Sequence, residues 1–171
     1  MKFYYIKDEY IDFLKKYDNI VAENKQESRP YVGTVFEIEG HKYYAPFTSP
    51  KSKHKKMKNN IDFRKIDNGR LGAINFNNMI PIVDNAIIPV KFNEIENLNY
   101  KKLLQKQYIA INKDSDSIMK IAKKLREIVF SSDEKLTSQE KKIKLRCCNM
   151  PLLEAKSSEY ENRWERRKKQ W

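Results

Sequence analysis

The first half of the chain alternates apolar and polar positions with the short periods of strands and of one small helix. Phe3 to Ile6 is rich in aromatic residues and predicts a strand. Asp8 and Glu9 follow, and they suit the positive end of a helix dipole. Apolar side chains then recur at the i, i+3, i+4, i+7 spacing of one helical face, at Tyr10, Phe13, Leu14 and Tyr17. We therefore expect a strand, a short amphipathic helix and a polar loop over residues 18–28.

A hairpin and several shorter strands are predicted next. Tyr31 to Ile38 is aromatic and β-branched with alternation, Glu39-Gly40 marks a turn, and His41 to Phe47 returns as a second strand. Pro50 cannot donate to a strand ladder and ends the hairpin. Four short strand-like runs separated by Asn-rich turns follow, at 61–66, 70–75, 79–83 and 86–90. Closely spaced short strands of this kind predict a small β-barrel.

The period becomes helical beyond Phe92. Apolar residues fall on one helical face in two groups, Leu103, Leu104, Tyr108 and Ile111, then Ile118, Ile121, Ala122, Leu125, Ile128 and Val129. Asp114 or Ser115 is a candidate cap for the second helix. Residues 131–150 are polar and give no clear assignment, whereas Pro151 begins a last, exposed helix. We predict a single α+β domain over residues 1–171, with a β-rich core at about 1–92 and a helical region at about 93–171.

The composition indicates a class of binding partner. The 171 residues are 40% hydrophobic and 12% aromatic, which is enough to build a core. Lys and Arg number 35 against 23 Asp and Glu, for a net charge of +12. Such an excess favours nucleic acid, which gains affinity from counterion release, although charge alone names no reaction.

Membrane and disulfide classes are not supported. No apolar run approaches the roughly 20 residues of a spanning helix. The vicinal Cys147 and Cys148 offer neither a disulfide framework nor metal-ligand spacing. We expect a reduced, cytoplasmic protein.

The segment from Thr48 to His54 carries the candidate chemistry. Metal-free RNA cleavage needs a base for the 2′-hydroxyl, an acid for the leaving 5′-oxygen and donors for the charge on the phosphate. The hydroxyls of Thr48 and Ser49 suit hydrogen bonds to phosphate oxygens, and Lys51 supplies a mobile charge. Arg29 can add a bidentate fork if the fold brings it near. Taken alone, however, the segment is more typical of a lysine-rich surface loop.

Two candidate roles stay open at this point. His54 has an ordinary pKa near neutrality and is a natural general acid or base, but a histidine among lysines is often part of a solvated basic face. Tyr31 can stack on a base, although a tyrosine at a strand start is more often packed in the core. His41, beside Gly40, is expected to be a plain surface residue.

A basic strip is expected to follow the RNA backbone. Its members lie on or near the lysine-rich segment: Lys53, Lys55, Lys56, Lys58 and Arg64. With two histidines and no acidic cluster beside them, neither a catalytic metal nor another cofactor is expected.

The order of these features resembles the ToxN/AbiQ family of type III toxins. The matching stretches are Lys2–Tyr4 leading into Tyr10–Leu14, Val32-Gly33 with Glu37–Tyr43, Ala45–Lys51 with His54, Leu71–Asn75 with Met79–Pro81, and the helical region Tyr100–Val129. The most specific piece is the hairpin that ends in Thr-Ser-Pro-Lys and is followed by a histidine. The resemblance covers roughly residues 2–130, and the basic C-terminal segment lies outside it.

The resemblance implies a compact β-barrel like that of the MazF and Kid toxins, elaborated with helices. It also implies metal-independent cleavage of adenine-rich RNA to 2′,3′-cyclic phosphate and 5′-hydroxyl ends. The partner it implies is a repetitive antitoxin RNA, processed into pseudoknots that hold the toxin in a closed protein-RNA ring, in a system of phage defence by abortive infection. Neither DNA nor membrane is expected as a partner.

Site residues follow from the same resemblance, position by position. Thr48, Ser49 and Lys51 match the family's active-site threonine, serine and lysine, and Arg29 falls where the family has a catalytic lysine. Arginine keeps the charge but does not release its proton at neutral pH. The family's preceding tyrosine has no counterpart in residues 23–28, and Tyr31 is the nearest substitute.

Two rival functions remain from the residues alone. A non-catalytic RNA-binding module would equally explain the charge and the aromatic residues. A membrane-surface protein using the basic C-terminal helix is a weaker alternative, because Leu152 and Leu153 lead into a mostly charged segment.

Overall fold

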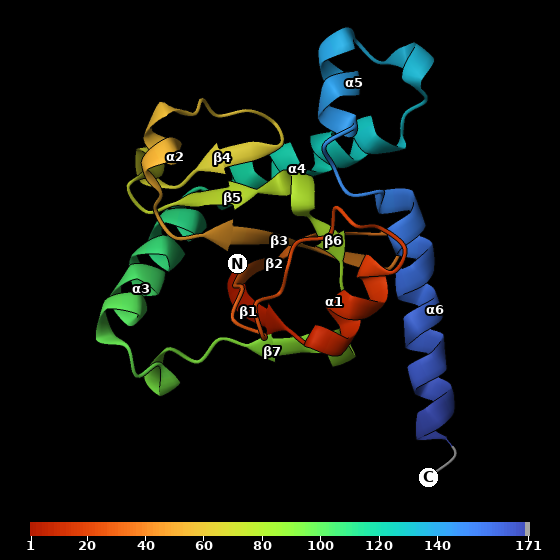
Figure 1. Cartoon of the computed structure of the whole chain (residues 1–171), viewed down its shortest axis with the longest axis horizontal. Coiled ribbons are helices and arrows are strands. Elements are labelled where there is room, and N and C mark those ends of the chain that lie inside the picture. Colours follow the sequence, from red (N-terminus) through yellow and green to blue (C-terminus); the bar gives the residue numbers. More distant parts are fainter. Residues whose placement is uncertain (170–171) are drawn as a thin grey trace.

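An antiparallel sheet forms the centre of the computed structural model, which describes residues 1–169 (Figure 1). Within these residues the strands run in the order β4-β5-β3-β2-β1-β7, and β6 pairs with β3. Their bounds are β1 (Lys2–Ile6), β2 (Tyr31–Ile38), β3 (His41–Thr48), β4 (Phe63–Lys65), β5 (Ala73–Asn75), β6 (Ile80–Pro81) and β7 (Ile87–Pro89). The predicted first strand and hairpin are thereby confirmed.

Six α-helices surround the sheet within the described part of the chain. They are α1 (Asp8–Lys15), α2 (Ser52–Lys56), α3 (Leu98–Lys113), α4 (Ser115–Phe130), α5 (Ser138–Lys144) and α6 (Met150–Lys168). The α+β class and the helical second half are as expected. The segment from Thr48 to His54, which taken alone is typical of a surface loop, runs into the short helix α2, and the unassigned stretch 131–150 contains α5.

The closure into a barrel that we expected is not seen. No pairing among residues 1–169 joins the two end strands, β4 and β7. The strands after β3 are only two or three residues long, and single 3-10 turns at Asp67–Gly69, Phe76–Asn78 and Asp84–Ala86 separate them. Each turn bends the chain before a longer ladder can form, so the sheet stays short at this side.

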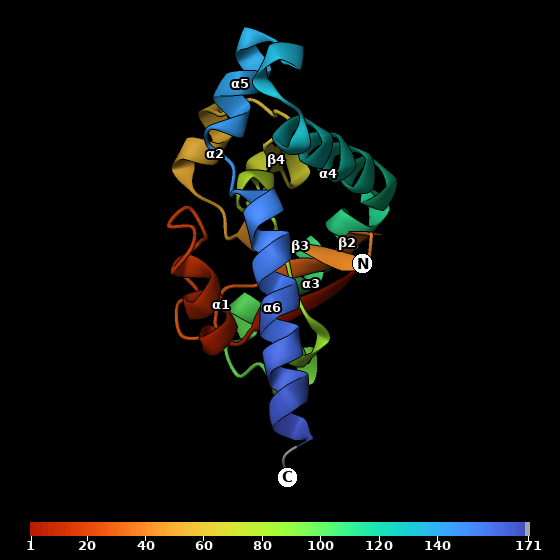
Figure 2. The same ribbon diagram turned by 90° about the vertical axis from the view of Figure 1, so that its right-hand side faces the viewer.

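Alternation along the strands divides the core into two parts, one on each face of the sheet. Val32, Tyr43 and Phe47 pack with apolar residues of α3 and α4. Their neighbours Tyr31 and Tyr44 point the other way and pack with residues of α1 and α6. Figure 2 shows α1 and α4 on opposite sides of the strands. The period of two in the hairpin is therefore explained by burial of both faces.

A buried ion pair joins α4 to α6. The Arg126 guanidinium donates to Oε1 of Glu154 from two nitrogens, at 2.9 and 2.7 Å, and the Tyr43 hydroxyl donates to the same oxygen at 2.6 Å. Arg126 and Glu154 are 9% and 8% exposed. His41, which we expected at the surface, is half-buried with Nε2 3.9 Å from Glu154 Oε2. The first half of α6, predicted to be exposed, is thus anchored in the core.

The predicted cap of α4 has a different partner. Asp114 is the N-cap residue, but its side chain makes no capping hydrogen bond. Its carboxylate instead accepts from Nε of Arg64 at 2.5 Å. Among the described helices, none is both long and apolar enough to cross a bilayer.

Candidate active site

A cleft of about 330 Å³ opens where β3 ends, between the loop before β2 and the helix α3. It brings together four of the predicted site residues, Arg29, Thr48, Ser49 and Lys51. Residues that we did not single out complete the walls: Tyr5, Lys25, Ser28, Pro30, Phe47, Tyr100 and Gln107. The fold therefore assembles the predicted cluster from segments far apart in the sequence.

The sheet fixes the position of Thr48. Phe47 and Thr48 pair with Ile74 and Ala73 of β5, and Pro50 ends the strand two residues later. Gly72 lies directly against this strand end, because a Cβ built there would be 1.8 Å from the Thr48 carbonyl oxygen. Its φ of +100° is also a conformation that favours glycine. The close approach holds the two hydroxyl residues at the rim of the cleft.

Gln107 fastens the same strand end to α3. Its Nε2 donates to the Thr48 carbonyl at 3.3 Å and to the Leu71 carbonyl at 2.7 Å. The residue is 1% exposed, so both bonds are shielded from water. We did not identify Gln107 from the sequence, although a polar residue between the apolar positions Leu104 and Ile111 of a helical stripe was a usable signal.

Polar groups of the cluster remain open to a ligand. Ser49 and Lys51 are exposed, and the Thr48 hydroxyl donates to the Ser49 carbonyl at 2.7 Å. Arg29 is half-buried, and its Nε donates to the Glu23 carbonyl. This bond orients the guanidinium and leaves its two terminal nitrogens without a partner in the described residues. Two cations and two hydroxyls suit the oxygens of a phosphate.

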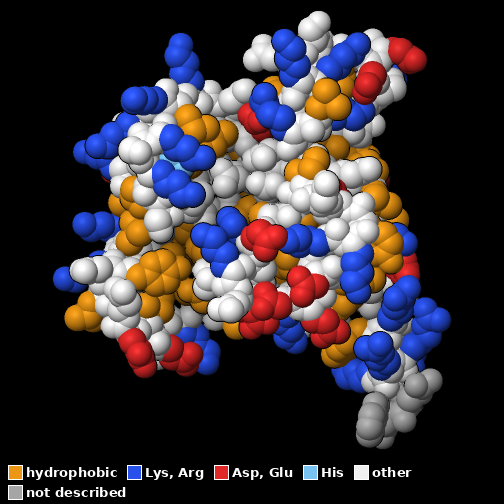
Figure 3. Space-filling view, in the orientation of Figure 1, with side chains coloured by type: hydrophobic (Ala, Val, Ile, Leu, Met, Phe, Trp, Pro, Cys, Tyr) orange, Lys and Arg blue, Asp and Glu red, His pale blue; other side chains and the backbone are white. Residues whose placement is uncertain are grey.

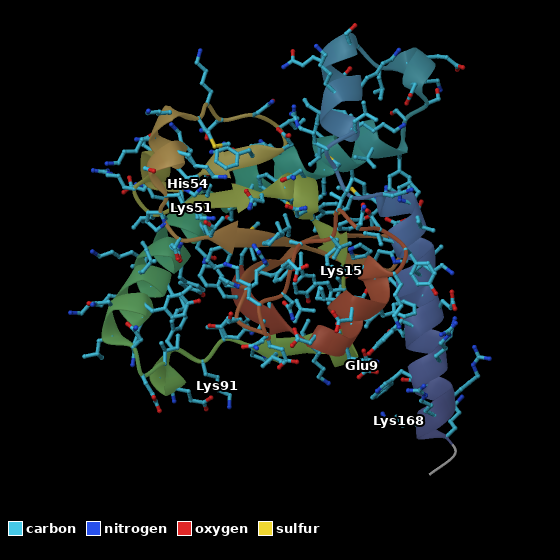
Figure 4. All side chains as sticks on the ribbon, viewed as in Figure 1. Glu9, Lys15, Lys51, His54, Lys91 and Lys168 are labelled. Atoms are coloured by element: carbon cyan, nitrogen blue, oxygen red, sulfur yellow. The ribbon has the colours of Figure 1, made fainter. Side chains whose placement is uncertain are left out.

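His54 is not part of a solvated basic face, as one alternative had it. It is 1% exposed and its ring lies 5.8 Å from that of Phe63. Nδ1 accepts from the Lys51 backbone N–H at 3.2 Å, and the His54 N–H donates to the Lys51 carbonyl at 2.9 Å. Figure 4 shows the two residues adjacent at the start of α2. His54 therefore positions the Lys51 backbone.

The protonation state of His54 matters for this bond. An imidazole whose Nδ1 accepts must be neutral, with its proton on Nε2. Burial first, and then the charges of Lys51 and Lys53, lower the pKa of His54 from its ordinary 6.5. The neutral ring, and with it the contact to Lys51, is therefore retained at neutral pH and lost only in acid.

Substitution of His54 should separate positioning from acid-base chemistry. Asn places its oxygen where Nδ1 lies, whereas Gln carries the oxygen further out. We expect His54→Asn to keep most RNA cleavage and His54→Gln to lose about tenfold, as for one missing hydrogen bond. Wild-type activity should fall only below pH 6.5, because protonation removes the acceptor. Initial rates from pH 5 to 8 measure both effects. A loss of 100-fold or more in His54→Asn would instead indicate direct proton transfer.

Tyr31 does not occupy an RNA-contacting position. The residue is fully buried, and it packs with Tyr10, Tyr44 and Cys148 on the α1 side of the sheet. Burial raises the pKa of its hydroxyl, which has no hydrogen-bond partner among the residues that the structure describes. The core placement that the sequence left open is the correct one. Tyr5 and Tyr100 line the cleft instead. The pKa of the Tyr100 hydroxyl is raised, mainly by burial and secondly by its hydrogen bond with Tyr5.

The expected basic strip is only partly continuous with the cleft. Lys53, Lys55, Lys56 and Lys58 are exposed on α2 and just after it. Figure 3 shows Lys and Arg side chains gathered over α2 and the outer edge of α3. Arg64 lies apart from these lysines, because its guanidinium is paired with Asp114 and lines a different surface hollow. In residues 1–169 no three His, Cys, Asp or Glu side chains gather as metal ligands would.

Comparison with known proteins places this geometry in a family. The family described as toxin ToxN of type III toxin-antitoxin systems matches residues 2–158. Endoribonuclease ToxN of Pectobacterium atrosepticum is 35% identical over 170 residues, which cover 94% of each chain. A solved structure concerning selective toxin inhibition by a non-coding RNA pseudoknot superposes with a TM-score of 0.81 at 32% identity, covering 94% of this chain and 97% of the other. The structure of AbiQ, a lactococcal anti-phage endoribonuclease, gives 0.78 at 28% identity and covers 94% and 98%.

Proposed function

The chain belongs to the ToxN toxin family of type III toxin-antitoxin systems, and we infer that it is an endoribonuclease whose activity an RNA pseudoknot inhibits. The observation that carries the site assignment is the cleft that joins Arg29, Thr48, Ser49 and Lys51. Relatives that act as endoribonucleases match along nearly the whole chain, so the activity does not rest on one motif.

We propose that cleavage proceeds by attack of the 2′-hydroxyl on the adjacent phosphorus, without a metal ion. The 2′-hydroxyl gives up its proton as the O2′–P bond forms, and the P–O5′ bond breaks as O5′ takes up a proton. The products are a 2′,3′-cyclic phosphate and a 5′-hydroxyl. Lys51 and Arg29 would neutralise charge that grows on the phosphate. The Ser49 hydroxyl would donate to its oxygens, and the Thr48 hydroxyl would do so after turning from the Ser49 carbonyl. Arg29 keeps its proton at neutral pH and so contributes charge and hydrogen bonds only.

The antitoxin would occupy the same cleft. The net charge of +12 and the exposed lysines of α2 favour a polyanion across this face. A pseudoknot bound here would exclude substrate by sterics and by charge. By its family relationship we further propose adenine-rich targets, processing of a repetitive antitoxin RNA, a closed ring of protein and RNA, and a role in phage defence by abortive infection.

The reaction is tested with RNA-free protein and an adenine-rich RNA in excess EDTA, followed by mapping of the new termini. We expect cyclic-phosphate ends from the wild type and none from Thr48→Ala, whose fold is checked by circular dichroism. Cleavage that needs added Mg²⁺ would overturn the metal-independent chemistry. Tight RNA binding without any cleavage would instead favour an RNA-binding module.

A further inference from the structure

A second cleft lies on the other side of the Thr48–Lys51 segment. Its volume is about 260 Å³, and Thr48 and Lys51 line both this cleft and the first. The remaining walls include apolar side chains, Phe63 and Met57, and three amides, Asn75, Asn77 and Asn78. The two clefts thus share the wall that carries the groups proposed to hold the phosphate.

Most polar groups of the second cleft are already engaged. Asp62 accepts from two nitrogens of Arg146, at 3.0 and 2.7 Å. The Asn78 amide donates to the Ile20 carbonyl at 2.8 Å, and that of Asn77 reaches the Arg146 carbonyl at 3.5 Å. The Asn75 side chain makes no hydrogen bond in the described part of the chain. Of the three amides, its half-buried carboxamide is therefore the one left to meet a ligand, beside the exposed ammonium of Lys53 and Nε2 of His54.

The fold holds Asn75 at a fixed offset from Thr48. Asn75 is the last residue of β5 and pairs with Phe63 of β4. Two residues earlier, Ala73 of the same strand pairs with Thr48. Because both residues belong to one hydrogen-bonded ladder, a group bound by Asn75 keeps a constant position relative to a phosphate at Thr48. Such rigidity is what discrimination between similar ligands requires.

The chemistry of these walls fits a nucleobase. A free carboxamide presents a donor and an acceptor side by side, and it pairs with a base edge that offers the complementary set. Phe63, which is 9% exposed, and Met57, which is 37% exposed, add apolar surface for the faces of a ring. An RNA strand whose phosphate lies at the shared wall can place the nucleotides on its two sides in the two clefts.

We propose that the second cleft is a base-reading subsite, in which Asn75 recognises the nucleobase on one side of the scissile phosphate. The proposal rests on the ribonuclease function above and adds to it the part of the protein that selects the cleavage site. It assigns the first cleft to the nucleotide on the other side of that phosphate.

The test uses short single-stranded RNAs in which each of the four bases is placed in turn on either side of one cleavage site. We expect wild type to prefer particular bases on both sides, and Asn75→Ala to lose about tenfold or more of the preference on one side only. Asn93→Ala, at an exposed position that lines neither cleft, is the matched control, and both preferences should be retained there. The kcat/KM values for the two series of four substrates, which share one reference RNA, give the preferences.

A second variant distinguishes a change in base preference from a general loss of structure. Asn75→Asp replaces the amide with an acceptor-only group and should shift the preference on that side towards bases that offer an exocyclic amine. Equal loss on all substrates, or an unchanged preference in both Asn75 variants, would overturn the subsite while leaving the ribonuclease intact. Absence of cleavage by the wild type would overturn the proposed function itself.

Discussion

Replacing Lys51 with Met should reduce RNA cleavage by about 100-fold or more while the fold is retained. Met keeps the aliphatic length of the side chain and removes only the charge, which we place next to the phosphate. Loss of one group that stabilises developing charge costs about 100- to 1,000-fold in kcat. Because Lys51 is exposed, its removal leaves no buried group without a partner. Single-turnover rates at saturating enzyme measure the chemical step directly.

The matched control is Lys55→Met, in the short helix α2 that follows Lys51. Lys55 is exposed and lines neither cleft, so its charge should contribute to RNA binding without contacting the reacting phosphate. We expect weaker binding, a smaller salt dependence and an almost unchanged single-turnover rate. Equal losses in the two variants would show that Lys51 acts only as one cation of a basic surface.

Breaking the ion pair between α4 and α6 should cause a large loss in the free energy of unfolding. Arg126→Met leaves the Glu154 carboxylate buried with the Tyr43 hydroxyl as its remaining close donor. Removing one partner of a buried pair costs about 3–5 kcal/mol in the free energy of unfolding. We expect a loss of that size in urea denaturation, measured in a Thr48→Ala background so that the protein accumulates in cells.

Two further variants check the cause. Lys124→Met removes a cation from the same helix, but this residue is 58% exposed and pairs with Glu127 at 3.4 Å, so stability should change little. Arg126→Met combined with Glu154→Met removes both charges and should be less destabilised than Arg126→Met alone. A double variant at least as unstable as the single one would contradict the role we give to the stranded carboxylate.

Local patterns predicted the helices and strands that are long enough to show a repeating spacing of apolar residues. The hairpin of β2 and β3 and the helices α3 and α4 carry eight to sixteen residues of consistent alternation or helical spacing. The strands β4 to β7 lie within the four predicted runs but are only two or three residues long, and their expected closure into a barrel was not seen. The helix α2 was missed because five polar residues give no apolar stripe; its one buried side chain is His54.

The site was predictable only where its residues are contiguous or match the family pattern. Thr48, Ser49 and Lys51 follow one another at a strand end, so the resemblance could place them together. Gln107 and Asn75 act from other elements, and their contribution depends on pairings that span long stretches of sequence. Tyr31, the nearest substitute for the family's missing tyrosine, lies in the core, because alternation along β2 turns its ring to the face covered by α1 and α6.

The hydrogen bond between Gln107 and Thr48 can form in a newly synthesised chain only after Gln107 has been translated. The two residues are 59 positions apart. At about 5 to 20 residues per second, a ribosome needs roughly 3 to 12 seconds to pass from one to the other. Throughout that interval the strand end that carries Thr48 and Lys51 lacks the helix that fastens it, so the emerging peptide has no assembled cleft. The cell therefore meets an active molecule only after translation has passed well beyond the hairpin, and antitoxin RNA already present has that time to meet the chain.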